Sequence, residues 1–457
     1  MTVMGLDVGT TGMKIGIYRL ANRELTLAGQ FSRNYEINTY NNGQFSDIEP
    51  EKWQAAFVAG CQELAPLLAD VEAIGISGTT PGMTAMGADG TALYPAILML
   101  DQRSRVQATE VIHTVGLKKI LEETSNMPVA GGCSLASILW LRDNRPEVFK
   151  NAACFGHSNS YMAKWLTGGF AIDPSSASLT ALYNTVKNDL TWNQEIARTF
   201  GIRMEQLPPV MLGFESPGRV RGPLAKELGL VSEPPVAIGG NDAVLAAYSI
   251  GIKEPGDYVD VNGTCEISMV CLDRCYPSTK YNIRAHVLAG RWLTLYVMNA
   301  EGKAFEWFRG VFCSEMDYDR FYQDFMPKAV DCWLERESSV SYTPYLMGSR
   351  YSQEPLKAEF LGMTPVTTRE ELMAALVRGL AEYQREHLKE ISLVQPIKPV
   401  VHVTGGAVNP SLINAKRKWM MPGAEYVFEE QSSMKGAAML ALKCLEEGRQ
   451  DTGAAAF

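Results

Sequence analysis

The chain has 457 residues, with 42 Lys and Arg against 51 Asp and Glu, which gives a formal net charge of −9. Hydrophobic residues make up 46% and charged residues 20%, a balance that supplies large cores and excludes global disorder. The acidic excess excludes a broad basic surface for nucleic acid, and at roughly 150 residues per domain the length favours two or three domains.

Signals for export or membrane insertion are missing from the sequence. Its start, MTVMGLDVGTTG, has no basic segment followed by a long apolar stretch, and no run approaches the roughly 20 apolar residues of a spanning helix. The nine cysteines are scattered and odd in number, which argues against a full disulfide framework. Cys271 and Cys275 form a lone C-x3-C, for which ordinary thiols are favoured over a zinc site. We therefore expect a soluble, cytoplasmic protein with no membrane partner.

Strand-like and helix-like stretches alternate along the chain. Apolar, β-rich runs predict strands over 3–8, 14–18, 73–76, 236–238, 258–261, 267–271 and 400–403. Helical periodicity predicts helices over 51–69, 135–142, 243–250, 369–390 and 432–447. Such alternation predicts an α/β fold in which helices cover sheets.

Two segments repeat one pattern. LDVGTTGMKIGIY (6–18) and VDVNGTCEISMVC (259–271) each read as strand, Gly-Thr turn and strand, with an Asp before the turn. Similar hairpins at the heads of two halves suggest a duplicated architecture, divided near residue 250, where GIKEPGD (251–257) is rich in turn formers. The alternative is that the two turns are unrelated, because Gly-Thr turns are common in hairpins.

Neither common nucleotide loop occurs in the sequence, since it lacks both G-x-x-x-x-G-K-[ST] and G-x-G-x-x-G after a strand. The Gly-Thr turns offer another cradle, because successive backbone N–H groups in a tight turn form a concavity for phosphate oxygens. Gly9, Thr10 and Thr11 make one candidate, and Gly263 with Thr264 makes the other. Two such turns facing each other across a cleft would clamp a triphosphate.

Two aspartates are candidates for the chemistry. Asp7 ends the first strand just before the first turn, where a carboxylate can hold Mg²⁺ beside phosphates. Asp242 follows the strand-like VAIGGN (236–241) at the start of a helix, so it could cap the helix or act as a general base toward a substrate hydroxyl. The double glycine before it favours the functional interpretation slightly, because glycine lets backbone and ligand approach closely.

Further glycines lie where a strand meets a helix. Gly405 and Gly406 follow the strand at 400–403, and flat backbone there can lie against a nucleotide base or ribose, with a plain turn as the alternative. Gly302 stands near the start of another predicted helix.

In this order the motifs resemble the FGGY carbohydrate kinase family, the group that contains xylulokinase and glycerol kinase. The resemblance covers nearly the whole chain, and its specificity lies in the ordered set of motifs. The set comprises a first phosphate motif GLDVGTTGMK (5–14), a sugar-pocket segment (73–104), a first signature CSLASILWLRDNRPE (133–147), the close of the N-terminal domain LTGGFAIDPSSAS (166–178) and PPVAIGGNDAVLAAYSIG (234–251), a second phosphate motif VNGTCEIS (261–268), a second signature GSRYSQEPLKAEFLGM (348–363), an adenosine motif TGGAVNPSLINAKRKWM (404–420) and a final helix SSMKGAAMLAL (432–442).

The resemblance implies two actin-like, ribonuclease-H-like domains with a catalytic cleft between them, here residues 1–248 and 249–457. Sugar would bind mainly on the first domain and ATP mainly on the second, Mg²⁺ is the implied metal, and the resemblance also suggests a homodimer. Position by position, Asp242 matches the catalytic base and Asp7 the acidic residue near Mg²⁺ and the phosphates. The other matched positions are Thr10, Thr11, Gly263 and Thr264 in the phosphate loops, Gly302, Gly405, Gly406 and Asn409 on the nucleotide side, and Asp101 and Arg103 near the substrate.

The sequence departs from the family where substrate is expected. After Gly78 the family's xylulokinases carry Gln-Met-His and its glycerol kinases a polar Gln-Arg-Glu run, whereas Thr79, Thr80 and Pro81 stand here. Ser137 stands where the first signature usually has Lys. Thr79 and Thr80 thus become the substrate-side candidates, together with Asp242, and neither named substrate follows from the resemblance.

Three functions are weighed on this basis. The leading hypothesis is ATP-dependent phosphorylation of a hydroxyl of a small sugar or polyol, with a ketopentose-like substrate favoured. The altered pocket motivates a second hypothesis, a sugar sensor or scaffold that uses the same cleft without chemistry. A third is an actin- or chaperone-type ATPase, against which the sugar-pocket segment at 73–104 stands.

Overall fold

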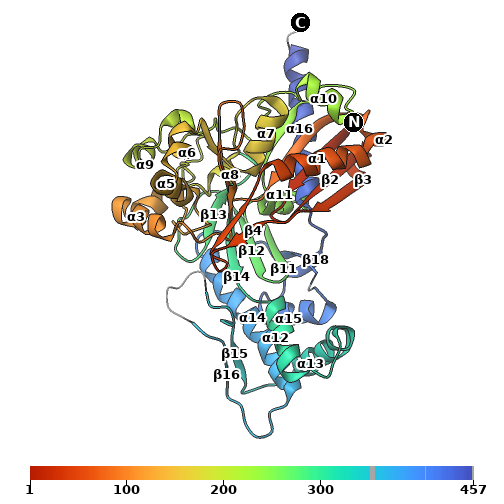
Figure 1. Cartoon of the computed structure of the whole chain (residues 1–457). Coiled ribbons are helices and arrows are strands. Elements are labelled where there is room, and N and C mark those ends of the chain that lie inside the picture. The colour runs from red at the N-terminus through yellow and green to blue at the C-terminus, as the bar shows by residue number, and fades with distance from the viewer. Residues whose placement is uncertain (350–355, 407, 455–457) are drawn as a thin grey trace.

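The computed structural model describes residues 1–349, 356–406 and 408–454. Figure 1 shows an elongated molecule in which the N-terminal sheet and the C-terminal end lie in one half and α12 to α15 lie in the other. The fold is mixed α/β, as the alternating sequence pattern predicted.

The first sheet has the strand order β10-β6-β1-β2-β3. Strands β1 and β2 form an antiparallel hairpin, whereas β1, β6 and β10 run parallel, so their carboxyl ends meet at one edge. The bounds are β10 (Val236–Asn241), β6 (Val71–Gly78), β1 (Thr2–Val8), β2 (Gly12–Ala21) and β3 (Glu24–Asn34). Both faces of β1 are buried, which is why its sequence is apolar almost throughout.

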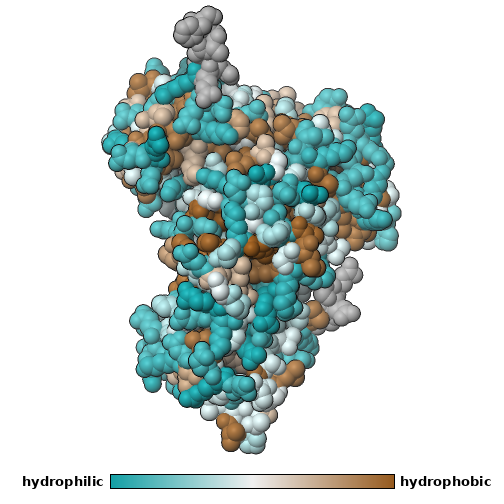
Figure 2. All heavy atoms as spheres, turned by 180° about the vertical axis from the view of Figure 1, so that it is seen from behind, coloured by the Kyte–Doolittle hydropathy of each residue, from teal (hydrophilic) through white to brown (hydrophobic). Residues whose placement is uncertain are grey.

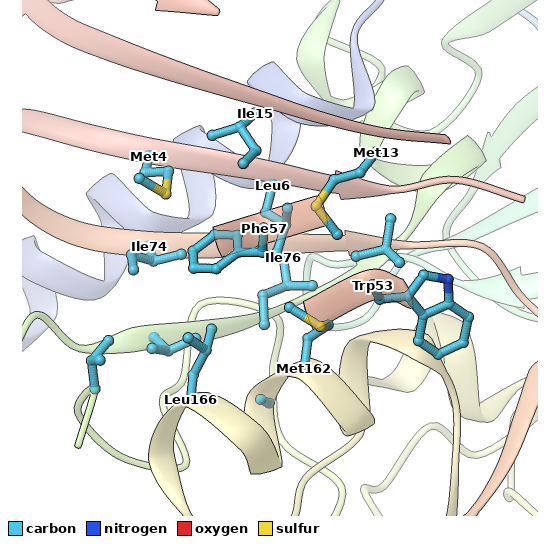
Figure 3. Packing of buried hydrophobic residues seen from close by; sticks show 14 of the residues in the cluster. Met4, Leu6, Met13, Ile15, Trp53, Phe57, Ile74, Ile76, Met162 and Leu166 are labelled. Atoms are coloured by element: carbon cyan, nitrogen blue, oxygen red, sulfur yellow. The ribbon is translucent and has the colours of Figure 1, made fainter. Parts of the chain in front are cut away.

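Different partners cover the two faces of this sheet. Met4 and Leu6 point toward α1 (Glu51–Glu63) and α7 (Ser158–Thr167), where Figure 3 shows them packed with Phe57 and Met162. Helix α16 (Ser433–Ala454), from the end of the chain, lies on the opposite face. The helix approaches so closely that a Cβ atom at Gly5 would lie 2.0 Å from the Met434 carbonyl oxygen.

The rest of the N-terminal part surrounds this sheet. A smaller sheet has the order β4-β5-β8-β7-β9. Its strands are β4 (Asn38–Tyr40), β5 (Phe45–Ile48), β8 (Ala96–Leu98), β7 (Gly82–Met86) and β9 (Cys154–Gly156). The remaining helices are α2 (Ala65–Leu68), α3 (Arg105–Val115), α4 (Leu117–Thr124), α5 (Ser134–Asn144), α6 (Pro146–Asn151), α8 (Pro174–Ala177), α9 (Gln194–Thr199), a 3-10 turn (Met204–Gln206), α10 (Gly222–Leu228) and α11 (Asp242–Ser249).

The second large sheet repeats the plan of the first. Its order is β13-β14-β12-β11-β17-β18, with an antiparallel β11–β12 hairpin and parallel β11, β17 and β18. The bounds are β13 (Asn282–Ala285), β14 (Trp292–Met298), β12 (Glu266–Leu272), β11 (Tyr258–Asn262), β17 (Val400–Thr404) and β18 (Glu425–Phe428). The similar hairpins in the sequence thus head two similar sheets, and the expected two-domain, actin-like fold is confirmed.

Helices of the second half pack beside this sheet. They are α12 (Gly302–Phe312), a π-helical turn (Arg320–Phe325), α13 (Met326–Trp333), α14 (Arg369–Ser392) and α15 (Pro410–Trp419), next to a small hairpin of β15 (Ser341–Thr343) and β16 (Glu359–Leu361). Part of the second signature, 350–355, lies outside the described residues. A division at residue 249 separates the two large sheets, and α16 packs on the first of them. The boundary of 1–248 and 249–457 stays a prediction.

One predicted helix differs in the structure. The stretch 51–69 forms α1 and α2, which are interrupted at Leu64, because Pro66 stands in the first turn of α2 and cannot continue a helix from before it. All nine cysteines are free thiols. Within the described ranges, no helix has both the length and the apolar character needed to cross a bilayer. Figure 2 shows hydrophilic residues over most of one face, with apolar residues gathered near its middle.

Candidate active site

The carboxyl ends of the parallel strands bring the two predicted aspartates to one edge of the first sheet. Asp7 lies opposite Ser77 in the β1–β6 register, and Ser77 lies opposite Gly240 in the β6–β10 register. Asp242 begins α11 directly after β10. The edge beyond the carboxyl ends of parallel strands is where open α/β sheets bind ligands. The fold therefore places Asp7 and Asp242 on the same ligand-binding side.

Asp7 is held by a neighbour on the adjacent strand. Ser77 Oγ donates a hydrogen bond of 2.8 Å to Asp7 Oδ1. Burial raises the pKa of the Asp7 carboxyl, while the hydrogen bond from Ser77 and the charge of Lys14, opposite Asp7 in the hairpin, act to lower it. A partly desolvated carboxylate at this edge is a strong oxygen donor for a cation.

Asp242 does not cap its helix, because Asn241 does so by accepting a bond of 3.3 Å from Val244 N. Asp242 Oδ1 instead accepts from Ala243 N at 2.7 Å and from Asn241 Nδ2 at 2.9 Å, contacts that fix its orientation. Burial, followed by the charge of Asp7, raises the pKa of Asp242 to about 6, and the Arg284 cation opposes the shift. A carboxylate with this pKa can accept a proton from a hydroxyl near neutral pH.

The first Gly-Thr turn lies beside Asp7. Gly9 N donates to Gly12 O at 2.9 Å and closes the turn. Tyr35, the residue directly after β3, donates from its hydroxyl to Gly9 O at 2.5 Å. Thr10 Oγ1 lies 2.9 Å from Thr79 Oγ1, so this turn is tied to the segment that follows β6. Thr11 is exposed at the tip of the turn.

The second Gly-Thr turn opens into a separate cavity of about 380 Å³. Most of the predicted nucleotide positions line it, namely Gly263, Thr264, Gly302, Gly406 and Asn409. Gly302 needs to be glycine, because a Cβ atom there would lie 2.7 Å from the Gly263 carbonyl oxygen. Residues that are far apart in the sequence thus line one cavity.

Gly405 and Asn409 support this cavity in different ways. Gly405 has a φ of +108°, and a Cβ atom there would lie 2.0 Å from the Asn262 carbonyl oxygen, so it packs behind the turn. Asn409 caps α15 by accepting a hydrogen bond of 3.0 Å from Leu412 N.

Sequence reasoning missed an aromatic wall of this cavity. Tyr318 and Tyr322 line it, and their ring centroids lie 4.4 Å apart. Aromatic faces of this kind suit the stacking of a nucleobase. The only signal in the sequence is a pair of tyrosines four residues apart, which on its own is equally typical of a packing helix.

A third group of predicted residues lies beside a cavity between the two lobes, the parts of the chain built around the first and the second large sheet. Thr79 and Thr80 are buried, and Thr80 Oγ1 donates to Gly78 O at 3.1 Å. Arg103 Nη2 lies 2.7 Å from Asp47 Oδ2, and Arg103 Nε lies 2.8 Å from Asp101 Oδ2. The guanidinium also lies over the Phe45 ring, 4.4 Å from its centroid. Thr79, Thr80, Asp101 and Arg103 are thus all engaged with other protein groups.

Their immediate neighbours line a cavity of about 460 Å³ between the two lobes. Its polar side combines Gln102 and Asn126 with Asn282 and Arg284 of β13, which sequence reasoning did not single out. Its apolar side is formed by Pro81, Met99, Leu100, Met127, Val129, Ala130 and Leu179. Arg284 Nη1 donates to Asn241 Oδ1 at 2.6 Å, which connects this cavity to the residue before Asp242.

Comparison with known proteins agrees with this arrangement. The family model described as "FGGY family of carbohydrate kinases, N-terminal domain" matches residues 2–249, more than half of the chain. The chain belongs to the FGGY family of carbohydrate kinases. FGGY kinases are phosphotransferases, so this chain is an enzyme that phosphorylates a sugar with ATP as the phosphoryl donor.

Similar proteins and similar solved structures align with nearly the whole length of this FGGY kinase. The xylulose kinase of Lactococcus lactis is 25% identical over 448 residues, covering 96% of this chain and 87% of the relative. The structure of xylulose kinase from Rhodospirillum rubrum has a TM-score of 0.89 at 21% identity, covering 97% of this chain and 89% of its own. Gluconate kinase from Lactobacillus acidophilus has a TM-score of 0.85 at 21% identity, with coverage of 97% and 89%.

The residues of this FGGY kinase fit a divalent cation at the edge of the first sheet. In the part of the chain that the structure describes, no cluster of three or more His, Cys, Asp or Glu residues could hold a metal. Asp7 and Asp242 stand at the same edge of the sheet, and the charge of Asp7 contributes to the raised pKa of Asp242. Mg²⁺ commonly takes one or two carboxylates and completes its shell with substrate phosphates and water, which matches this donor set.

Proposed function

We propose that this kinase transfers the γ-phosphoryl group of ATP to a primary hydroxyl of a small ketose or polyol, with Asp242 as the general base. The observation that carries the proposal is the meeting of Asp7 and Asp242 at one sheet edge, with the pKa of Asp242 raised to about 6 by burial and then by Asp7. Above that pH the ionised Asp242 orients the acceptor hydroxyl and takes its proton as the phosphoryl group arrives.

The chain's remaining groups would bind and orient the phosphates. The turns at Gly9–Thr11 and Gly263–Thr264 offer backbone N–H groups and hydroxyls, and Asp7 would hold Mg²⁺ beside them. When bound, Mg²⁺ would neutralise the charge that develops on the phosphoryl group during transfer. Closure of the space between the lobes would exclude water and so limit wasteful hydrolysis of ATP.

The cavity between the lobes supports a substrate that is polar on one side. Gln102, Asn126 and Asn282 can satisfy hydroxyl groups, whereas Pro81 and Met127 offer none of the donors that the family usually has after Gly78. Such a lining favours a ketopentose-like substrate that carries few hydroxyl groups on the side that faces Pro81. Thr79, Thr80, Asp101 and Arg103 would then shape the wall of the cavity rather than supply most of its hydrogen bonds.

A coupled ADP-release screen over C3–C6 polyols, ketoses and sugar acids, each paired with its deoxy analogue, tests the function. We expect ADP release with at least one compound, and Asp242→Asn to lower turnover by about 10² or more while ADP affinity is retained. Asp89→Asn, at an exposed carboxylate in a turn, is the matched control.

The other outcomes separate the alternatives. Sugar binding without ADP release under Mg²⁺ and ATP would favour the sensor. ATP hydrolysis that no sugar stimulates would favour the ATPase. Full turnover of Asp242→Asn would reject the role of Asp242. The homodimer that the resemblance implies is tested by sedimentation.

A further inference from the structure

A buried ammonium group lies under the second Gly-Thr turn. Lys416, on α15, is buried, and its Nζ lies 2.6 Å from Asp260 Oδ2, 2.6 Å from Glu266 Oε1 and 3.4 Å from Glu301 Oε1. Asn262 Oδ1 also accepts a hydrogen bond from it. The ammonium therefore sits among four oxygen atoms, in the way that a bound cation would.

The oxygen donors come from the β11–β12 hairpin and from the start of α12, both of which contribute residues to the nucleotide cavity. Asp260 and Asn262 belong to β11, Glu266 begins β12, and Glu301 immediately precedes α12. Asn262 and Glu266 are the last opposed pair of the hairpin, directly below the turn. Lys416 thus joins α15 to the hairpin and to the start of α12.

Glu301 connects the cluster to the turn itself. Its backbone N donates to Thr264 O at 3.2 Å, and the next residue, Gly302, donates to Gly263 O at 3.0 Å. These bonds fix the two carbonyl groups of the Gly263–Thr264 turn. A shift of the Glu301 side chain would therefore move the backbone that lines the phosphate side of the cavity.

Charge balance shows that the cluster depends on Lys416. Three carboxylates and one ammonium would carry a net charge of −2 if all were ionised. Among the residues with described side chains, Asp260 Oδ1, Glu266 Oε2 and Glu301 Oε2 have no hydrogen-bond partner. Removal of one partner from a buried charged cluster leaves uncompensated charge in a low dielectric.

We propose that Lys416 is a positioning residue for nucleotide binding, an internal cation that fixes the Gly263–Thr264 turn through Asp260, Glu266 and Glu301. The inference rests on the proposed function only in taking this cavity as the nucleotide site. Without the ammonium, Asp260, Glu266 and Glu301 lose the donor that they share, and the turn loses its fixed geometry.

The protonation of the cluster supports this role. Burial raises the pKa values of Glu266 and Glu301, against the opposing charge of Lys416. Burial lowers the pKa of Lys416, but the three carboxylates outweigh it, so this pKa lies well above its ordinary value. Tyr258 and Tyr426 are the other titratable side chains that feel the cluster, and their raised pKa values keep them neutral. Ionisation of the glutamates at alkaline pH adds negative charge beside the phosphate turn, so nucleotide affinity should fall as pH rises.

Equilibrium titration of the full chain with ADP tests the proposal without any need for sugar turnover. We expect Lys416→Met to weaken ADP binding by about tenfold or more, and Lys416→Arg to restore part of it, whereas sugar binding is unchanged. Lys418→Met, at a more exposed lysine of the same helix that pairs with Glu335, should bind ADP like the parent chain. Glu301→Gln should flatten the dependence of ADP affinity on pH between about 6 and 9.

Two results would overturn the proposal. The first is that Lys416→Met is folded, as judged by near-UV circular dichroism, and binds ADP as tightly as Lys418→Met does. The other is an equal loss of ADP and sugar affinity, which indicates general damage to the fold. If Lys416→Met does not fold, Lys416→Arg and Glu301→Gln decide the question, and an unchanged pH dependence in Glu301→Gln counts against it. Failure of the sugar screen would remove the comparison with sugar affinity but leave the ADP titrations of Lys416→Met, Lys416→Arg and Lys418→Met, so the two hypotheses fail separately.

Discussion

Asp7 and Asp242 stand at the carboxyl ends of β1 and β10, with only β6 between these strands, and the charge of Asp7 helps to raise the pKa of Asp242. Two strand spacings separate β1 from β10 by about 10 Å, a distance that a substrate phosphate can bridge. The first sheet thus brings together the proposed cation ligand and the proposed proton acceptor from strands that are more than 200 residues apart in sequence.

The pH dependence of turnover follows from this pair. Because burial and then Asp7 raise the pKa of Asp242 to about 6, the base is ionised, and active, only above that pH. We expect kcat/KM to rise about tenfold per pH unit below 6 and to level off above it. Asp7→Asn removes a negative charge, so the Asp242 pKa should fall and the acid limb should move to lower pH. Initial rates with saturating ATP measure both profiles, and an acid limb that moves upward would contradict this coupling.

Gly302 gives a test of the nucleotide cradle. In Gly302→Ala the new Cβ would lie 2.7 Å from the Gly263 carbonyl oxygen, so the turn must move. We expect the KM for ATP to rise by about tenfold while the KM for sugar is unchanged. Gly310→Ala lies in the same helix, where a Cβ meets nothing within 4 Å, and should leave both constants unchanged. Equal behaviour of the two variants would show that the turn does not bind nucleotide.

Arg103 is expected to matter for stability. Its guanidinium is buried between Asp47 and Asp101, so Arg103→Met would leave two carboxylates without their cation. The free energy of unfolding should fall by about 3–5 kcal/mol. Arg19→Met removes an exposed pair with Asp70 at 3.5 Å and should cost about 1 kcal/mol or less. Chemical denaturation compares the two variants, and a loss in Arg103→Met no larger than in Arg19→Met would contradict the assignment.

The contact of α16 with the first sheet depends on small residues. A Cβ atom at Gly75 would lie 2.0 Å from the Ala437 carbonyl oxygen, so Gly75→Ala should destabilise the fold by about 1–3 kcal/mol. In Gly448→Ala, also in α16, the new Cβ meets nothing within 4 Å, and the helix should be as stable or slightly more so. Thermal unfolding distinguishes the two, and equal melting temperatures would show that the helix can move away from the sheet.

Local patterns in the sequence predicted the parts of the fold and site that depend on neighbouring residues. Each hairpin combines alternating apolar residues with a Gly-Thr turn, so β1–β2 and β11–β12 were predicted from their own segments. The choice between cap and base for Asp242 could not be made from the sequence, because Asn241 and Asp242 are both good caps. Only the structure shows that the Asn241 side chain accepts the capping bond from Val244 N.

The features that the sequence did not predict depend on long-range contacts. Lys416 meets Asp260 across 156 residues, and nothing in the helical segment around Lys416 marks it as buried. Asp101 and Arg103 suggested a substrate contact, but Asp47, from a distant strand, completes a buried ion pair with them. Pairings of this kind are set by topology rather than by any local pattern.

The chain passes between the two lobes at two places, after α11 and before α16, and these crossings touch. Ser432 N donates a hydrogen bond of 3.0 Å to Ser249 Oγ, which joins one crossing to the other. Because the two connections lie side by side, we expect any relative rotation of the lobes to pivot about them. Such a rotation would change the separation between the Gly263 turn and the Asp7 edge, and hence the alignment of phosphoryl donor and acceptor.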